Sequence, residues 1–261
     1  VYKRQGLKMK EVTLDILKNF SSRFHGINCI EIQKDLFIPF LENADSSIFN
    51  DIHRVQFDWF NNSFHCNFQN VQELTMIGAN CVDCIIENNQ TLKKITLINS
   101  APLSLSSILQ YPEIQLVYVF PRDGKFEFLP NISYRSISIK DCELTSLSSL
   151  FNRCDLSHLE YLEINEILDR EKTFDYSLFS HINRLSLSSS LDSIEISYPM
   201  RIFYGKYLTL AGFDLTIWKS SANLPNVIKA EFIRCRLPPP PDDDDEDFFL
   251  SNVRIISLSH I

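Results

Sequence analysis

Residues 134–144 read YRSISIKDCEL, and residues 227–237 read VIKAEFIRCRL. Both segments have apolar residues at their first, fourth and sixth positions, a cysteine at the ninth and a leucine at the eleventh. The alternation of apolar and polar residues in the middle of each segment is typical of a β-strand that buries one face. The same spaced pattern at two distant places predicts a repeated structural unit.

Looser copies of this pattern recur along the chain. They begin at residues 27, 52, 71, 92, 111, 134, 159, 182, 205, 227 and 253, and the copy at 205 is degenerate because Gly205 stands in an apolar position. These eleven starting points give a mean interval of 22.6 residues. One unit of this size cannot bury its apolar face alone, so neighbouring units must stack and share a core. The sequence therefore predicts a solenoid with one strand in each turn.

The pattern and its period resemble those of leucine-rich repeats, whose units have about 20–29 residues. The resemblance implies an α/β repeat fold with a parallel concave β-sheet, helical or irregular convex segments, and about eleven repeats over residues 6–261. It also implies that Cys142 and Cys235 point inward, near the backbone of the turn. A β-sandwich or a β-helix is the alternative, and the scarcity of glycine disfavours hairpin-rich folds.

Three segments between the predicted strands have helix-like apolar spacing: residues 7–20, 103–109 and 144–151. We expect the first to form an amphipathic helix. Residues 1–5, VYKRQ, resemble the translated end of a sequencing-library adaptor, so we expect them to be non-native and the chain to be a fragment, incomplete at both ends. Residues 238–247 contain four prolines and then six acids, and they predict a solvated loop within the solenoid.

The net charge indicates which partners are disfavoured, and the cysteine content indicates the compartment. The net charge is −8, six of those negative charges lie in the run from Asp242 to Asp247, and the rest of the chain carries −2. A nearly neutral body does not predict binding to nucleic acid or to an anionic membrane. The seven cysteines are irregularly spaced, which favours reduced thiols and a cytoplasmic or nuclear protein.

Residues with catalytic or metal-binding chemistry form no convincing cluster. Cys81 and Cys84 make a C-x-x-C pair, and with His65 and Cys66 they could be imagined as a zinc site. Their place directly after a predicted strand favours small buried residues instead. The sequence has no phosphate-binding glycine loop and no nucleophile signature beside a histidine. We expect no metal, no cofactor and no enzymatic activity.

Residues between the inward-pointing positions are predicted to face outward on the concave sheet, where a protein partner would bind. The surface is polar and of mixed sign, and tyrosine and arginine often supply binding energy in protein interfaces. The predicted binding residues are Gln56, Thr75, Thr96, Gln115, Ser138, Tyr161, Glu163, Arg184, Ser186, Tyr207, Thr209, Lys229 and Glu231.

The irregular repeat lengths and the serine-rich return segments also resemble the repeats of fungal F-box proteins. This resemblance implies that the chain recognises substrates for a ubiquitin ligase, whose adaptor would bind a segment upstream of residue 1. The alternative is a cell-surface leucine-rich-repeat adhesin or antigen of a microbe or protist, because residues 147–164 resemble the repeats of such proteins.

Overall fold

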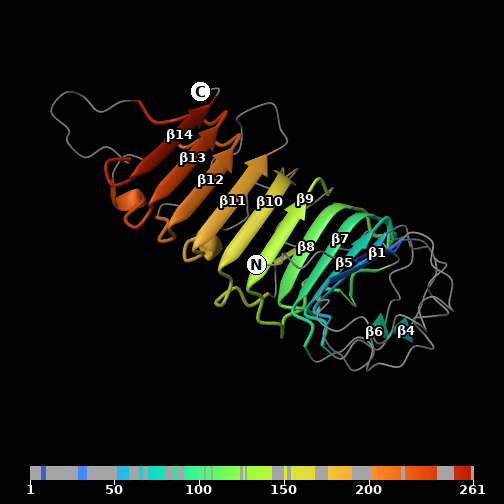
Figure 1. Ribbon diagram of the computed structural model, residues 1–261. Helices are drawn as coiled ribbons and strands as arrows, with labels where there is room; N and C mark the ends of the chain where they lie inside the picture. The colour runs from blue at the N-terminus through green and yellow to red at the C-terminus, as the bar shows by residue number, and fades with distance from the viewer. Residues whose placement is uncertain are drawn as a thin grey trace, which may run out of the picture. The chain divides into compact units, whose positions relative to one another are not determined.

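The computed structural model describes the chain in seventeen stretches (Figure 1). They are residues 7–9, 29–33, 52–58, 65–66, 70–79, 85–86, 91–102, 104–106, 108–123, 126, 128–142, 150–151, 154–167, 176–189, 202–218, 221–239 and 250–259. The chain forms two compact units, unit 1 from Val1 to Lys125 and unit 2 from Phe126 to Ile261.

Unit 1 is built on a parallel sheet whose strands follow one another in chain order. These strands are β1 (Leu7–Met9), β2 (Cys29–Gln33), β3 (Arg54–Asp58), β5 (Glu73–Ile77), β7 (Lys94–Ser100) and β8 (Glu113–Val119). Two short strands, β4 (His65–Cys66) and β6 (Ile85–Ile86), pair in parallel in a separate small sheet.

Unit 2 has the same plan. Its strands are β9 (Ser136–Lys140), β10 (Tyr161–Ile167), β11 (Arg184–Ser189), β12 (Tyr207–Ala211), β13 (Lys229–Ile233) and β14 (Ile255–Ser259), again parallel and in chain order. Two 3-10 helices, η4 (Tyr176–Phe179) and η5 (Ser221–Asn223), lie in its return segments. Parallel neighbours in chain order make each unit a solenoid, because every connection must bring the chain back to the start of the next strand.

The strand register follows the sequence pattern. Leu185 of β11 pairs with Leu162 of β10 and with Leu208 of β12, and Leu187 pairs with Ile164 and Leu210 in the same way. These inward residues are at most 2 % exposed. The predicted parallel-sheet solenoid is thus confirmed in both units. The apolar positions of the pattern form buried rows that run as far as β13, whereas Ile256 and Leu258 of β14 are exposed.

A sharp turn after the strand is a second repeated feature. In six copies of the pattern, a residue with positive φ stands two positions beyond the last apolar residue, and the residue that follows it is buried. The positive-φ residues are Gly78, Asn99, Tyr118, Asp141, Gly212 and Arg234. Cys142 and Cys235 follow two of these turns, and their thiols donate to the carbonyl oxygens of Lys140 at 3.1 Å and Leu210 at 3.3 Å. Both cysteines therefore point inward, as the repeat pattern implied.

Aromatic rings fill much of the core of unit 2. Phe151 stacks on Phe128 with ring centroids 5.6 Å apart, and its edge meets Phe179 at 5.4 Å. The degenerate copy at Gly205 has a steric explanation within this core. A Cβ atom there would collide with the carbonyl oxygen of Ile182 and the ring of Phe203, so the phenylalanine occupies the space that an apolar residue at 205 would fill.

Helix is much rarer than predicted. Leu7–Met9 is strand β1 and not the start of a helix, because Leu7 and Met9 stand opposite Ile30 and Ile32 in the ladder. Within 103–109 the described residues form turns, in which Leu109 N donates to Leu105 O at 2.9 Å. Only the last two residues of 144–151 are described, and they are helical.

The prediction of a helical convex side is therefore wrong for most of the described return segments, because turns and irregular backbone are enough to bring the chain back to the next strand. The count of eleven complete repeats is not supported either, because several return segments that would complete a turn lie outside the described residues. No helix of the described residues is long and apolar enough to span a membrane. Residues 1–5, Cys81, Cys84 and residues 240–247 of the acidic loop also lie outside the described residues.

Candidate functional site

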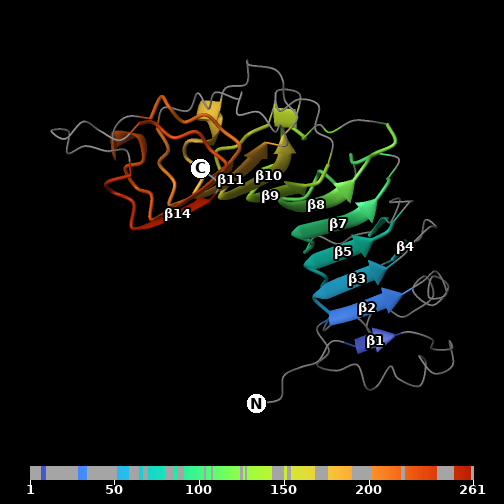
Figure 2. The ribbon, with the colours of Figure 1, turned by 90° about the horizontal axis from the view of Figure 1, so that it is seen from above.

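The outward residues of each sheet form rows that run from strand to strand. We call this side of the sheet the outer face. Its middle row consists of Glu31, Gln56, Thr75, Thr96 and Gln115 in unit 1, and of Ser138, Glu163, Ser186, Thr209, Glu231 and Ser257 in unit 2. Figure 2 shows the described return segments of unit 2 on the other side of its strands.

The thirteen predicted binding residues fall into two groups, one in each unit. Unit 1 holds Gln56, Thr75, Thr96 and Gln115, all in its middle row. Unit 2 holds the other nine on neighbouring strands: Ser138, Tyr161, Glu163, Arg184, Ser186, Tyr207, Thr209, Lys229 and Glu231. Two predicted residues offer a partner little surface, since Thr96 is 7 % exposed and Ser138 is 5 % exposed.

Glu163 of the outer face is bound by three neighbouring side chains. Tyr161 Oη donates to its Oε2 at 2.6 Å, Ser138 Oγ donates to the same oxygen at 3.0 Å, and Lys140 Nζ lies 2.9 Å from Oε1. Burial acts to raise the pKa of Glu163, but these hydrogen bonds and the charge of Lys140 outweigh it and leave the pKa below its ordinary value. Glu163 is thus a fixed anion that holds its neighbours in place.

A second row starts the strands of unit 2, and we call it the edge row. It contains Tyr161, Arg184, Tyr207 and Lys229 on four successive strands, in register. The guanidinium of Arg184 lies 5.5 Å from the centre of the Tyr161 ring, which is within cation–π range. Burial and the hydrogen bond to Glu163 raise the pKa of Tyr161, so its hydroxyl stays protonated and keeps donating. Aromatic and cationic side chains therefore alternate on a rigid ladder.

Four further exposed side chains lie at the same end of the unit 2 strands and were not predicted from the sequence. Tyr204 and Lys206 precede β12, Arg254 precedes β14, and Ile255 begins it. Sequence reasoning took its binding residues from within the strands, and none from β14. The positions directly before the strands could have indicated Lys206 and Arg254, because the ladder also aligns these positions.

The corresponding edge row of unit 1 is made of alternating charges. Arg54, Glu73, Lys94 and Glu113 stand opposite one another on β3, β5, β7 and β8. Arg54 Nε lies 3.2 Å from Glu73 Oε2, and both side chains are exposed, at 65 % and 41 %. Positive and negative side chains thus balance one another along this row.

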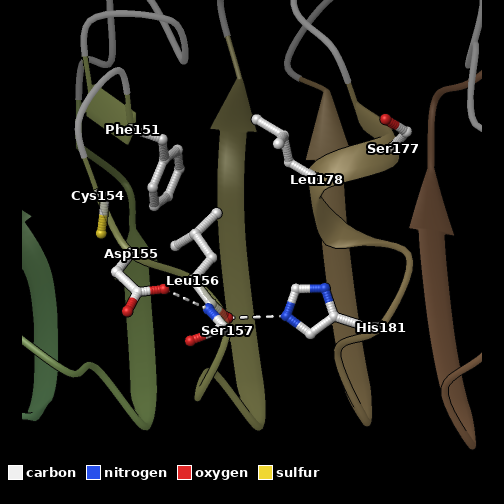
Figure 3. A pocket seen from close by; sticks show the side chains of 8 residues that line it. All are labelled: Phe151, Cys154, Asp155, Leu156, Ser157, Ser177, Leu178 and His181. Atoms are coloured by element: carbon white, nitrogen blue, oxygen red, sulfur yellow. Dashed lines mark hydrogen bonds between the residues drawn. The ribbon is translucent and has the colours of Figure 1, made fainter.

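Unit 2 also has a pocket on its return side, which is the side of the sheet where the return segments lie (Figure 3). It was not predicted, because its residues come from two different return segments: Phe151, Cys154, Asp155, Leu156, Ser157, Ser177, Leu178 and His181. Burial, and secondarily Asp155, raise the pKa of Cys154 to about 12, so the sulfur stays a thiol. His181 Nε2 lies 2.8 Å from Leu156 O, and Figure 3 shows the ring and Cys154 on opposite sides of Leu156.

Asp155 Oδ1 accepts a hydrogen bond from the backbone amide of Ser157 at 2.9 Å at the same pocket. Among the described residues, no group of three or more His, Cys, Asp or Glu side chains could hold a metal ion. Comparison with protein-family models, with curated proteins and with solved structures finds no match to this chain.

Proposed function

We propose that this protein binds another protein through the outer face of unit 2, as a non-catalytic recognition solenoid. The observation that carries the proposal is the edge row, in which Tyr161, Arg184, Tyr207 and Lys229 stand side by side on four successive strands. Tyrosine and arginine are enriched among the residues that dominate protein interfaces.

Rigidity and accessibility support this surface over the others. Tyr207 is 42 % exposed, and the middle row beside it consists largely of small polar residues such as Ser186 and Thr209, which leave room for a partner. Hydrogen bonds and the cation–π contact already fix Tyr161 and Arg184, so little side-chain freedom is lost when a partner binds.

The finer proposal is that the solenoid is of the leucine-rich-repeat type and selects substrates for a ubiquitin ligase. The repeat type is supported by the spaced apolar pattern, the recurring turn and the buried Cys142 and Cys235. The ubiquitin-ligase role rests only on the irregular repeat lengths and the serine-rich return segments of the sequence. A cytoplasmic or nuclear location is proposed with it. The four described cysteines that are free thiols, Cys29, Cys142, Cys154 and Cys235, favour a reducing compartment.

Site-specific photo-crosslinking in cells that express the full chain tests the proposed surface. A photo-reactive amino acid at Ser186, on the outer face, is compared with one at Ser157, in the pocket on the return side. Both side chains are small and reach solvent, so neither replacement disturbs the core. We expect a discrete protein adduct at 186 and none at 157. Adducts at 157 alone would overturn the proposal.

A further inference from the structure

The amino-terminal edge of the sheet in unit 2 gathers four cationic side chains on successive strands. Arg184 and Lys229 begin β11 and β13, and Lys206 and Arg254 directly precede β12 and β14. The backbone aligns them, since the amide of Ile228 donates to Lys206 O at 2.8 Å and similar bonds recur from strand to strand. All four side chains are exposed. We call these four residues the cationic edge.

Among the described residues, carboxylates neutralise little of the charge of the cationic edge. Within the described part of the chain, Lys229 alone of the four has a carboxylate within 4.0 Å, and that contact, to Glu231, is 4.0 Å long. Glu163 is already engaged by Lys140 and by two hydroxyl groups. An anionic ligand would therefore meet positive charges that the described residues have not already satisfied.

Aromatic and apolar surface lies between these charges. Tyr204, Tyr207 and Ile255 are 53 %, 42 % and 53 % exposed. Neighbouring strands lie about 4.8 Å apart, so the cationic edge spans about 14 Å from β11 to β14, and an extended peptide covers that distance with about five residues. The combination fits a polypeptide that has several acidic side chains and some apolar ones.

We propose that the cationic edge binds an acidic segment of a partner protein, about five residues or longer, laid across strands β11 to β14. This inference rests on the proposed function and names the chemistry of the partner. The carboxylates of the segment pair with Arg184, Lys206, Lys229 and Arg254, and its apolar side chains pack on Tyr207 and Ile255. Nucleic acid is less favoured, because tight binding to it needs many phosphate contacts and the chain has a net charge of −8.

Fluorescence anisotropy with the full chain tests the inference. The probe is a labelled peptide of glutamates interspersed with leucine, and a lysine–leucine peptide serves as its control. The variant Lys206→Gln/Lys229→Gln removes two charges from the cationic edge. Its matched control, Lys93→Gln/Lys94→Gln, removes two lysines at the same end of the strands in unit 1, where Glu73 and Glu113 flank Lys94.

We expect the wild type to bind the acidic peptide, more weakly as ionic strength rises, and not to bind the lysine–leucine peptide. The unit 2 double variant should bind the acidic peptide roughly five-fold more weakly, because each exposed charge pair contributes a factor of about 1.4 to 5 to the affinity. The unit 1 variant should bind the acidic peptide within about two-fold of the wild type, because the peptide makes no charge pair with Lys93 or Lys94. Charge reversal, Lys206→Glu/Lys229→Glu, should abolish binding while circular dichroism stays unchanged.

Three results would overturn the inference. They are equal weakening by both double variants, no binding of the acidic peptide, and tighter binding of a short oligothymidylate that the unit 2 variant weakens. A protein adduct at 186 without acidic-peptide binding would leave the proposed function standing and remove only the acidic partner. If the peptide binds and no adduct forms at 186, the cationic edge stands and the wider outer face does not.

Discussion

The two units share one backbone plan and differ in what lies on it. In unit 1 the edge row alternates in sign, and Arg54 and Glu73 pair at 3.2 Å. In unit 2 the same row alternates tyrosine with cations, and its exposed charges have few acidic partners among the described residues. Identical register therefore produces a surface that satisfies itself in one unit and a surface that can accept a ligand in the other.

The largest effect on the free energy of unfolding should come from substitutions in the core. Phe179 is 0 % exposed and lies against Phe151 in unit 2, whereas Leu97 occupies an equally buried position in unit 1. Phe179→Ala should lower the free energy of unfolding by about 4 kcal/mol and Leu97→Ala by about 3 kcal/mol, because each leaves a cavity that scales with the lost side chain. Urea denaturation measures both. A loss below 1 kcal/mol for Phe179→Ala would contradict the aromatic core.

Alanine substitutions at two glycines of unit 2 distinguish destabilisation by steric collision from destabilisation by backbone strain. Gly205→Ala places a Cβ atom against Ile182 O and the Phe203 ring, and should lower the free energy of unfolding by about 3 kcal/mol. Gly212 has φ +78°, and its added Cβ atom would lie 3.3 Å from Ser189 Cβ, so Gly212→Ala should cost about 1–2 kcal/mol. Thermal unfolding ranks the two variants. The reverse ranking would sink the explanation of the degenerate repeat.

Glu163 makes the stability of unit 2 depend on pH. The native pKa of Glu163 lies below its ordinary value of 4.5, so its stabilisation is complete above that value and is lost as pH falls through the native pKa. Glu163→Gln should lower the free energy of unfolding by about 1–2 kcal/mol at neutral pH, and less as the medium becomes more acidic. Thr75→Ala, in the middle row of unit 1, is the control and should show a pH-independent change. A constant deficit for Glu163→Gln would contradict this role.

The smallest effect should come from the exposed pair of unit 1. A double-mutant cycle on Arg54 and Glu73 should give a coupling below about 0.5 kcal/mol, because both side chains are solvated. The pair of Lys140 and Glu163 is 32 % and 15 % exposed, and its coupling should be about twice as large. Equal couplings would remove this distinction between the two outer faces.

The strands and their register could be predicted because burial alternates along each strand, and the sequence records that alternation. Leu185 and Leu187 are examples, since both lie where the repeat pattern put them. The return segments could not be predicted, because the same apolar spacing can bury side chains from a helix or from a turn. Leu105 and Leu109 have this spacing and lie in turns. Tyr118 and Arg234 show the same limit, since nothing in their side chains marks a positive φ.

The candidate site was predictable in part for a similar reason. Outward positions such as Arg184 and Tyr207 follow from the strand period, and both lie on the outer face. Their partners do not follow from it. The hydrogen bonds of Glu163 depend on which strands become neighbours, because they come from residues of two strands. The alignment of Lys206 and Arg254 beside the edge row depends on the same order of strands.

Mapping the cross-links of an acidic peptide on the full chain tests the central claim most directly. The peptide has a photo-reactive group at its centre, and mass spectrometry identifies the residues that it labels. The account predicts labelling around Tyr207 and Lys229 in unit 2, and none around Lys94 and Glu113 at the matched positions of unit 1. Equal labelling of both units, or labelling confined to unit 1, would contradict it.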